Sequence, residues 1–150
     1  MAESWRSRLR RWGFNLFPAF RGTGAWLTYL ADDFREVRLR IPLSWRTRNY
    51  VGTIYGGSMY AAVDPIYMIM LMHVLGDEYE VWDKAASIRF LEPAREELHA
   101  RFVLTDEEVD AIRSTLDGQR STDRHYTVEL RSAAGTVHAR VDKVVYVRRR

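Results

Sequence analysis

Hydrophobic positions recur at two different periods along this chain, and the change of period marks the predicted elements. In residues 4–16 apolar side chains return every three or four positions, which predicts an amphipathic helix with arginines on its other side. Residues 25–31 and 35–42 read as strands, the second alternating so that one face is buried and one is wet. Asp32 and Asp33 between these strands suit a hairpin turn.

The middle of the chain is apolar on nearly every side. From about Gly56 to Leu75 the pattern predicts one long helix, and Pro65 is expected to kink it because proline supplies no backbone N–H. The most apolar part, residues 66–75, is only ten residues long, whereas a membrane span needs about 20. We therefore predict a helix that is buried in protein.

The second half of the chain returns to strands. The predicted elements are strands at 80–91, 96–104, 124–132 and 137–148, a turn at Ala134–Gly135, and a helix that starts at the N-cap candidate Thr105. A sheet with one apolar face and a helix that is apolar all round need each other. We predict an α+β fold, with an antiparallel sheet of about five or six strands wrapped around one long central helix. Without linkers or repeats, residues 1–150 are expected to form a single domain, with an N-terminal helix in 1–18 and the core in 20–148.

Composition narrows the chemistry. Hydrophobic residues make up 47% and charged residues 29% of the 150, as in ordinary globular proteins, and the lack of cysteine excludes disulfides and thiolate-bound zinc. The four histidines lie far apart and no phosphate loop or dinucleotide motif occurs, so we expect no metal and no cofactor. The net charge of +3 comes without a basic stripe through the body, so nucleic acid is not an expected partner. Residues 1–20 lack the apolar core of a signal peptide, which favours a cytoplasmic protein.

The predicted N-terminal helix carries Trp5, Leu9, Trp12 and Leu16 on one face. We expect this face to pack on the helix's own domain. The alternative is that the helix lies on a membrane surface, since it combines tryptophans with arginines. Arginines also gather at residues 148–150. We expect the arginines at both ends of the chain to be solvated rather than to bind the phosphates of a membrane or an acyl carrier.

Two segments carry a resemblance to a known family. Residues 49–57 (NYVGTIYGG), with Asp64 seven residues after Gly57, resemble the signature of the phenylacetate-type hotdog thioesterases, Asn-x-x-Gly-x-x-His-Gly-Gly and then an acid at that offset. Residues 81–88 (VWDKAASI), together with Asp64 and the proline after it, are similar to a bacterial branch of the hotdog superfamily described only as a domain of unknown function. The resemblance covers about residues 20–148. It implies a hotdog fold, a homodimer with a tetramer left open, and a thioester substrate such as acyl-CoA.

The glycine pair has a physical interpretation beside the resemblance. Gly56 and Gly57 open the predicted helix, where free N–H groups and the helix dipole favour developing negative charge. An attacked thioester carbonyl becomes such an oxyanion, and one positioned donor contributes roughly 3 kcal/mol. The alternative is a glycine pair needed only for tight packing.

Asp64 is the favoured catalytic group. It lies two turns into the apolar helix, where we expect a partly desolvated carboxylate that suits a general base or a nucleophile. The alternative is that Asp64 merely caps the turn broken by Pro65. As the resemblance implies, Asn49 would hold the attacking water or the thioester carbonyl. The alternative is that Asn49 only forms the turn before Tyr50. Tyr55 departs from the family histidine, and because tyrosine is a poor base this puts the usual catalytic arrangement in doubt.

Further candidates follow from the hotdog dimer, in which a strand of one subunit faces the helix start of the other. By that resemblance Asp83, Lys84 and Ser87 would complete the site from across the dimer, unless Asp83 and Lys84 form an ion pair between subunits. If Asp83 came close to Asp64, the pKa of one of the two carboxyls would rise. Arg95 is a candidate for coenzyme A phosphates, although a solvated turn arginine is favoured, and Met68 for lining an acyl tunnel.

These residues support two functions. The first is an acyl-CoA thioester hydrolase that uses Asp64 and an oxyanion hole at Gly56 and Gly57. The second is a binding protein that keeps the acyl site without competent chemistry, for which Tyr55 is the main support.

Overall fold

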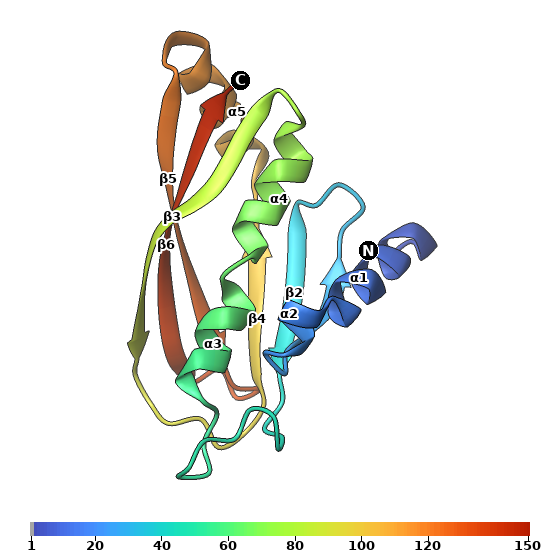
Figure 1. Cartoon of the computed structure of the whole chain (residues 1–150), viewed down its shortest axis with the longest axis vertical. Coiled ribbons are helices and arrows are strands. Elements are labelled where there is room, and N and C mark those ends of the chain that lie inside the picture. The colour runs from blue at the N-terminus through green and yellow to red at the C-terminus, as the bar shows by residue number, and fades with distance from the viewer. Residues whose placement is uncertain (1) are drawn as a thin grey trace.

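Six strands form one antiparallel sheet that curls around a central pair of helices (Figure 1). The computed structural model describes residues 2–150. The strands are β1 (Trp26–Leu30), β2 (Glu36–Ile41), β3 (Tyr79–Phe90), β4 (Leu98–Val103), β5 (Ser121–Arg131) and β6 (Val137–Arg149). The helices are α1 (Trp5–Leu16), α2 (Pro18–Arg21), α3 (Gly56–Val63), α4 (Ile66–Leu75) and α5 (Asp106–Gly118). The predicted α+β hotdog architecture is confirmed, and the strand order is β1-β2-β4-β5-β6-β3.

The core lies between the inner face of the sheet and the helices α3 and α4. Strand alternation supplies it: in β4 Leu98, Ala100 and Phe102 are buried while the residues between them are exposed. From the other side α4 buries Met70 and Leu71 completely. By length and mean hydropathy Gly56–Leu75 would pass for a membrane span, but half of its apolar window is buried inside the protein.

The predicted long helix is broken into α3 and α4 at Asp64 and Pro65. Pro65 has no N–H to donate to the preceding turn, and the helix resumes at Ile66 with Pro65 as its N-cap and no side-chain cap. Asp64 is the C-cap residue of α3 through its backbone N–H, which donates to Tyr60 O at 2.9 Å, while its side chain does not cap α4. The break turns the Asp64 side chain to other partners.

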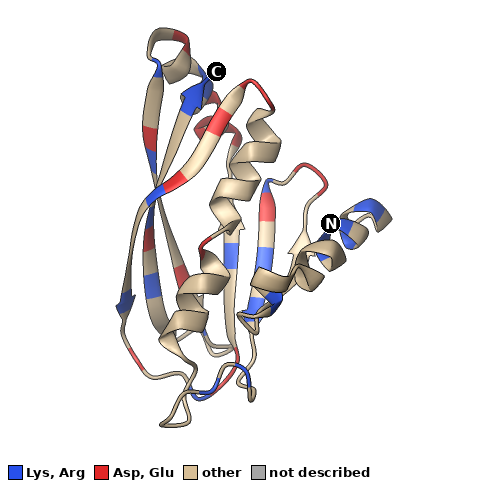
Figure 2. Ribbon diagram, viewed as in Figure 1, with Lys and Arg blue, Asp and Glu red and all other residues tan. Residues whose placement is uncertain are grey.

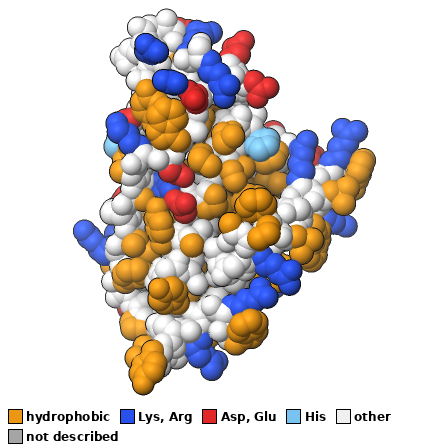
Figure 3. Space-filling view, viewed as in Figure 1, with side chains coloured by type: hydrophobic (Ala, Val, Ile, Leu, Met, Phe, Trp, Pro, Cys, Tyr) orange, Lys and Arg blue, Asp and Glu red, His pale blue; other side chains and the backbone are white. Residues whose placement is uncertain are grey.

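The expected packing of the N-terminal helix is wrong. Its apolar face points to solvent, with Trp5 67% and Leu9 63% exposed, whereas the polar Ser7 and Asn15 are buried. The reason is that α1 covers β1, the strand at one end of the sheet, whose outer N–H and C=O groups need partners. The Asn15 side chain supplies them, accepting from Leu27 N at 2.7 Å and donating to Leu27 O at 3.1 Å. Figure 2 shows basic residues along this projecting helix, and Figure 3 shows hydrophobic side chains beside them.

At the other end of the sheet β3 pairs with β6 and, among residues 2–150, with no strand on its outer side. A β-bulge interrupts this pairing, because Asp83 lies opposite Val145 and Ala85 opposite Val144, leaving Lys84 as the extra residue. Before the bulge odd-numbered residues face inward, and after it even-numbered ones do. Asp83 is thus the last inward-facing residue before the bulge.

Candidate functional site

Four side chains meet where the helix breaks. The Lys143 ammonium donates to Asp64 Oδ1 at 2.8 Å and to the Asp64 carbonyl oxygen at 3.0 Å. Asp83 Oδ1 lies 3.0 Å from the same nitrogen, and the Tyr60 hydroxyl donates to Asp64 Oδ1 at 2.9 Å. We call Tyr60, Asp64, Asp83 and Lys143 the Asp64 cluster. It brings together two of the predicted site residues, Asp64 and Asp83, within one chain.

Three elements position the Asp64 cluster. Tyr60 and Asp64 are four residues apart and so share one face of the helix that breaks at Pro65. Lys143 occupies an inward position of β6, between the buried Val141 and Val145. Inward strand positions normally hold apolar residues, and the Lys143 side chain at this one is enclosed, with 1% exposed.

Charge and burial act against each other in this cluster. Burial raises the pKa of Asp83, and the negative Asp64 adds to that, although the Lys143 ammonium opposes both. The Asp83 Oδ1 atom is buried and makes no well-aligned hydrogen bond, so the ion pair compensates its desolvation incompletely. Burial alone would lower the pKa of Lys143, but its contacts with Asp64 and Asp83 outweigh burial and raise it. Burial also raises the pKa of Tyr60, helped by its hydrogen bond to Asp64.

The Asp64 carboxylate has one oxygen left for a ligand. Both side-chain interactions use Oδ1, and within residues 2–150 Oδ2 accepts no hydrogen bond. The Asp64 side chain is 43% exposed and lies in the wall of a cavity of about 540 Å³ between α1–α2 and α3–α4. The rest of the lining is mainly apolar and includes Phe14, Phe17, Phe20, Ala61, Pro65 and Ile69. A carboxylate in an apolar cavity of this size is a suitable site for a ligand with a hydrocarbon part.

The glycine pair lies at the start of α3, as predicted, next to two aromatic rings. A Cβ on Gly56 would come within 2.9 Å of the Phe90 ring, and one on Gly57 would overlap the ring of Tyr55. These contacts do not by themselves require glycine, because both rings belong to side chains that are more than half exposed and can move aside. Nor do they remove the N–H groups of the two glycines, since the first N–H groups of a helix have no acceptor within it. Gly56 also lines a second cavity, of about 420 Å³, with Asn49 and Phe90.

The glycine pair and Asp64 are separate in one chain. Asp64 comes seven positions after Gly57, which at the helical rise is roughly 10 Å along the axis. One thioester carbonyl cannot contact both at that separation.

Asn49 has the role of a turn residue. Its Oδ1 accepts from Val51 N at 3.1 Å and Thr53 N at 2.9 Å, and its Nδ2 donates to Thr53 Oγ1 at 2.7 Å. This Asx-type turn occupies its polar atoms before Gly56. The Tyr55 side chain is 58% exposed and is not part of the Asp64 cluster.

The remaining candidates do not join the Asp64 cluster. Lys84 binds Asp123 at 2.7 Å, so within this chain Asp83 and Lys84 have different partners. Ser87 and Arg95 are exposed, and Met68 is half-buried on α4. These residues stay predictions for a site formed with a second chain.

Sequence reasoning missed Lys143 and Tyr60. The signal for Lys143 is its place in the inward series of residues 139–147, where every second residue is otherwise Ala or Val. Tyr60 could have been found from its four-residue spacing to Asp64.

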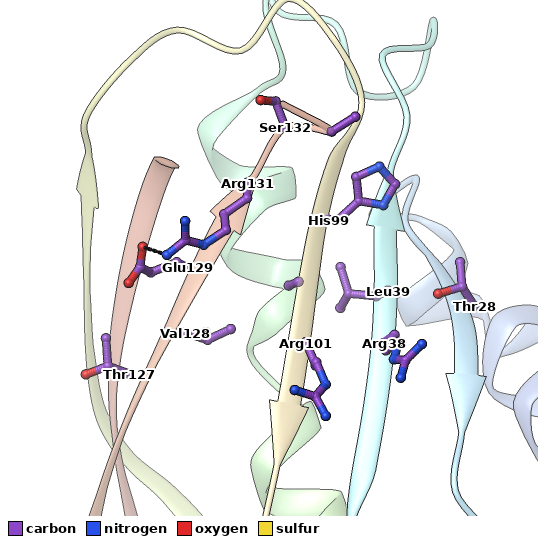
Figure 4. Close-up of a pocket in the computed structure, with 12 residues that line it drawn as sticks. Thr28, Arg38, Leu39, His99, Arg101, Thr127, Val128, Glu129, Arg131 and Ser132 are labelled. Atoms are coloured by element: carbon purple, nitrogen blue, oxygen red, sulfur yellow. Dashed lines mark hydrogen bonds and ion pairs between the residues drawn. The ribbon is translucent and has the colours of Figure 1, made fainter. Parts of the chain in front are cut away.

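A third hollow, of about 570 Å³, lies on the outer face of the sheet, where β4 and β5 share a single aligned pair, His99 with Arg131 (Figure 4). Its arginines already have acidic partners: Arg38 and Arg101 bind Glu36, and Arg131 binds Glu129. This charge balance makes it a weak site for an anion. No group of three metal-binding side chains occurs among residues 2–150.

Comparison with known proteins shows which proteins share this fold. Among solved structures the chain is similar to a Pseudomonas aeruginosa protein of unknown function described as a probable thioesterase, with TM-score 0.84, 19% identity and 99% of each chain covered. It is also similar to a thioesterase from Haemophilus influenzae, with TM-score 0.70, 14% identity, and 98% of this chain and 93% of that one covered. These likenesses show the fold. No curated protein matches the sequence. The profile of the family described as Domain of unknown function (DUF4442) matches residues 6–147, and the chain belongs to this family.

Proposed function

We propose that this protein hydrolyses acyl-CoA thioesters, with Asp64 as the catalytic carboxylate. The observation that carries the proposal is the Asp64 side chain in the wall of an apolar cavity, held through Oδ1 by Lys143 and Tyr60 with Oδ2 left free. The likeness to proteins described as thioesterases supports the same reaction.

In the proposed reaction Lys143 and Tyr60 orient the carboxylate through their hydrogen bonds to Oδ1. Asp64 Oδ2 takes a proton from water while the water oxygen attacks the thioester carbon. The C–S bond then breaks, and the thiolate leaves and takes up a proton. Direct attack by Oδ2, with later hydrolysis of the acyl-enzyme, uses the same atoms and remains the alternative route.

The reaction also needs donors for the oxyanion. We propose that these are the N–H groups of Gly56 and Gly57, supplied by a second copy, because roughly 10 Å separates them from Asp64 in one chain. The free edge of β3 supports a homodimer, since it presents unpaired backbone groups along a twelve-residue strand with exposed Ala85, Ala86 and Ser87.

Hydrolysis of acyl-CoA esters of graded chain length tests this proposal. We expect Asp64→Asn to lower kcat/KM by about 100-fold or more while the fold is kept. The matched control is Asp117→Asn, which removes a carboxylate that pairs with Arg149 on the surface. The proposal fails if the wild type hydrolyses no chain length, or if Asp64→Asn and the control have equal activity.

A second function, acyl binding without hydrolysis, is favoured by one observation. The Tyr55 ring lies over Gly57, where the oxyanion donor would be, and Tyr55 stands where the signature of the phenylacetate-type hotdog thioesterases has histidine. In that case calorimetry would show acyl-CoA binding, and no turnover would be seen with any thioester.

A further inference from the structure

The outer face of α1 is an exposed apolar surface on a charged helix. Trp5, Leu9, Trp12 and Leu16 recur at helical spacing and are 67%, 63%, 46% and 55% exposed, and Phe17 continues the face at 62%. Large apolar side chains that gather in this way on a soluble protein usually mark an interaction surface. We call these five residues the α1 face.

Polar contacts on the opposite side of α1 hold the α1 face outward. Asn15 binds the backbone of β1, Glu3 Oε1 accepts from Leu30 N at 3.1 Å, and Arg11 binds Glu3 at 2.8 Å. The Ser7 hydroxyl donates to Asp32 at 2.7 Å. Turning the helix to bury its aromatic residues would break all of these bonds, so the exposure is part of the fold.

Tryptophans extend the surface beyond α1. The Trp12 ring packs edge-on against Trp26 with ring centroids 6.3 Å apart. Trp26 in turn borders a hollow of about 250 Å³ that is also lined by Trp45 and Arg21, and Trp45 is 84% exposed. Four of the five tryptophans of the chain thus lie along this end of the sheet.

The charge of α1 selects the partner. Arg6, Arg8 and Arg10 are exposed on the helix, and the segment Trp5–Leu16 contains no acidic residue (Figure 2). Packing two copies through their α1 faces would bring these arginines together, with only Asp32, which lies near Arg6 and Arg10, to offset their charge in each copy. An anionic lipid surface instead offers phosphates to the arginines and an interfacial layer that suits tryptophan.

We propose that the α1 face docks on anionic phospholipid membranes. Trp5, Leu9 and Trp12 enter the headgroup region and the flanking arginines bind lipid phosphates. The α1 face lies at the β1 end of the sheet, opposite the free edge of β3, so that edge stays available to a second chain. Phe17 belongs both to the α1 face and to the lining of the Asp64 cavity, so docking brings that cavity next to the lipid.

Vesicle co-sedimentation of the full chain tests the proposal. The wild type is expected to bind vesicles with about 30% phosphatidylglycerol, and about tenfold more weakly to pure phosphatidylcholine or in about 0.5 M salt. Leu9→Ser/Trp12→Ser and Arg6→Gln/Arg8→Gln should each lower binding by about tenfold or more, through lost apolar and lost electrostatic contact. The melting temperature should change little for Arg6→Gln/Arg8→Gln, whose side chains are exposed. It should fall slightly more for Leu9→Ser/Trp12→Ser, which also loses the contact between Trp12 and Trp26.

The control is Tyr50→Ser/Met72→Ser, which removes two exposed apolar side chains outside the α1 face and should bind like the wild type. The proposal is overturned if the wild type does not bind anionic vesicles, or if the α1 variants bind as well as the control. It is also overturned if light scattering shows that Leu9→Ser/Trp12→Ser lowers the oligomeric mass without changing vesicle binding, because the occupant would then be a second copy.

Discussion

Replacing Lys143 with methionine tests whether the Asp64 cluster depends on a buried cation. Methionine keeps most of the side-chain volume but removes the ammonium, which is 1% exposed and contacts both carboxylates. Removing one partner of a buried ion pair costs about 3–5 kcal/mol. Asp64 is 43% exposed and Asp83 22%, so water takes over part of the lost interaction, and we expect a loss of about 3 kcal/mol at pH 7.

The loss should depend on pH in a defined direction. Without the ammonium, burial and the negative Asp64 raise the pKa of Asp83 further than in the wild type. Between pH 3.8, the ordinary pKa of an aspartate, and the raised pKa of Asp83, the folded state binds more protons than the unfolded state. Stability therefore falls as pH rises through this range. Lys143→Met should therefore be less destabilised near pH 4 than at pH 7.

Urea unfolding at fixed protein concentration measures the loss of unfolding free energy and its pH dependence. In a thermal scan the melting temperature of Lys143→Met should fall by about 6–12 °C at pH 7. The double variant Asp83→Asn/Lys143→Met is the control, since it removes the stranded carboxylate and should recover part of the stability. A loss under about 1 kcal/mol that is equal at pH 4 and pH 7 would refute the reasoning, because the ammonium would then be effectively solvated.

Three further predictions concern the rest of the fold. The hydrogen bond from Arg101 lowers the pKa of Glu36 to about 2. The stability that ionised Glu36 contributes is therefore present above pH 4.5 and is lost as pH falls through about 2. In acid unfolding followed by circular dichroism, Glu36→Gln should lose less stability across this pH range than the wild type. Asn15→Leu should cost about 1–3 kcal/mol in urea unfolding, because it leaves the buried Leu27 N–H without an acceptor while Leu27 O keeps only the hydrogen bond from Arg11 at 3.3 Å, and an unchanged midpoint would contradict this account of α1. Gly24→Ala should cost about 2 kcal/mol or more, since φ is +81° there and a Cβ would overlap the buried Thr47 side chain, whereas a cost near zero would show that Thr47 yields.

Much of the fold could be predicted from local patterns. Thr105 caps α5 by accepting from Glu108 N, and Gly135 takes the positive φ of the last hairpin, as their positions in the sequence indicate. The candidate site was predicted only in part. Asp64 and Asp83 were identified, but their link through Lys143 was not, because Lys143 is 79 residues from Asp64 and reaches it only through the register of β6.

The sequence by itself determined which segments are helices and strands, where most of them end, and that one apolar helix needs a sheet around it. These properties depend on backbone geometry and side-chain periodicity over a few residues. Only the tertiary structure decided which side of α1 is buried, since the unpaired edge of β1 binds Asn15 more favourably than a sheet edge binds tryptophan. It also decided that β3 lies at the far end of the sheet and that Asp83, which faces inward just before the bulge, lies next to Lys143. Strand order and register arise from contacts between distant segments, which no local pattern encodes.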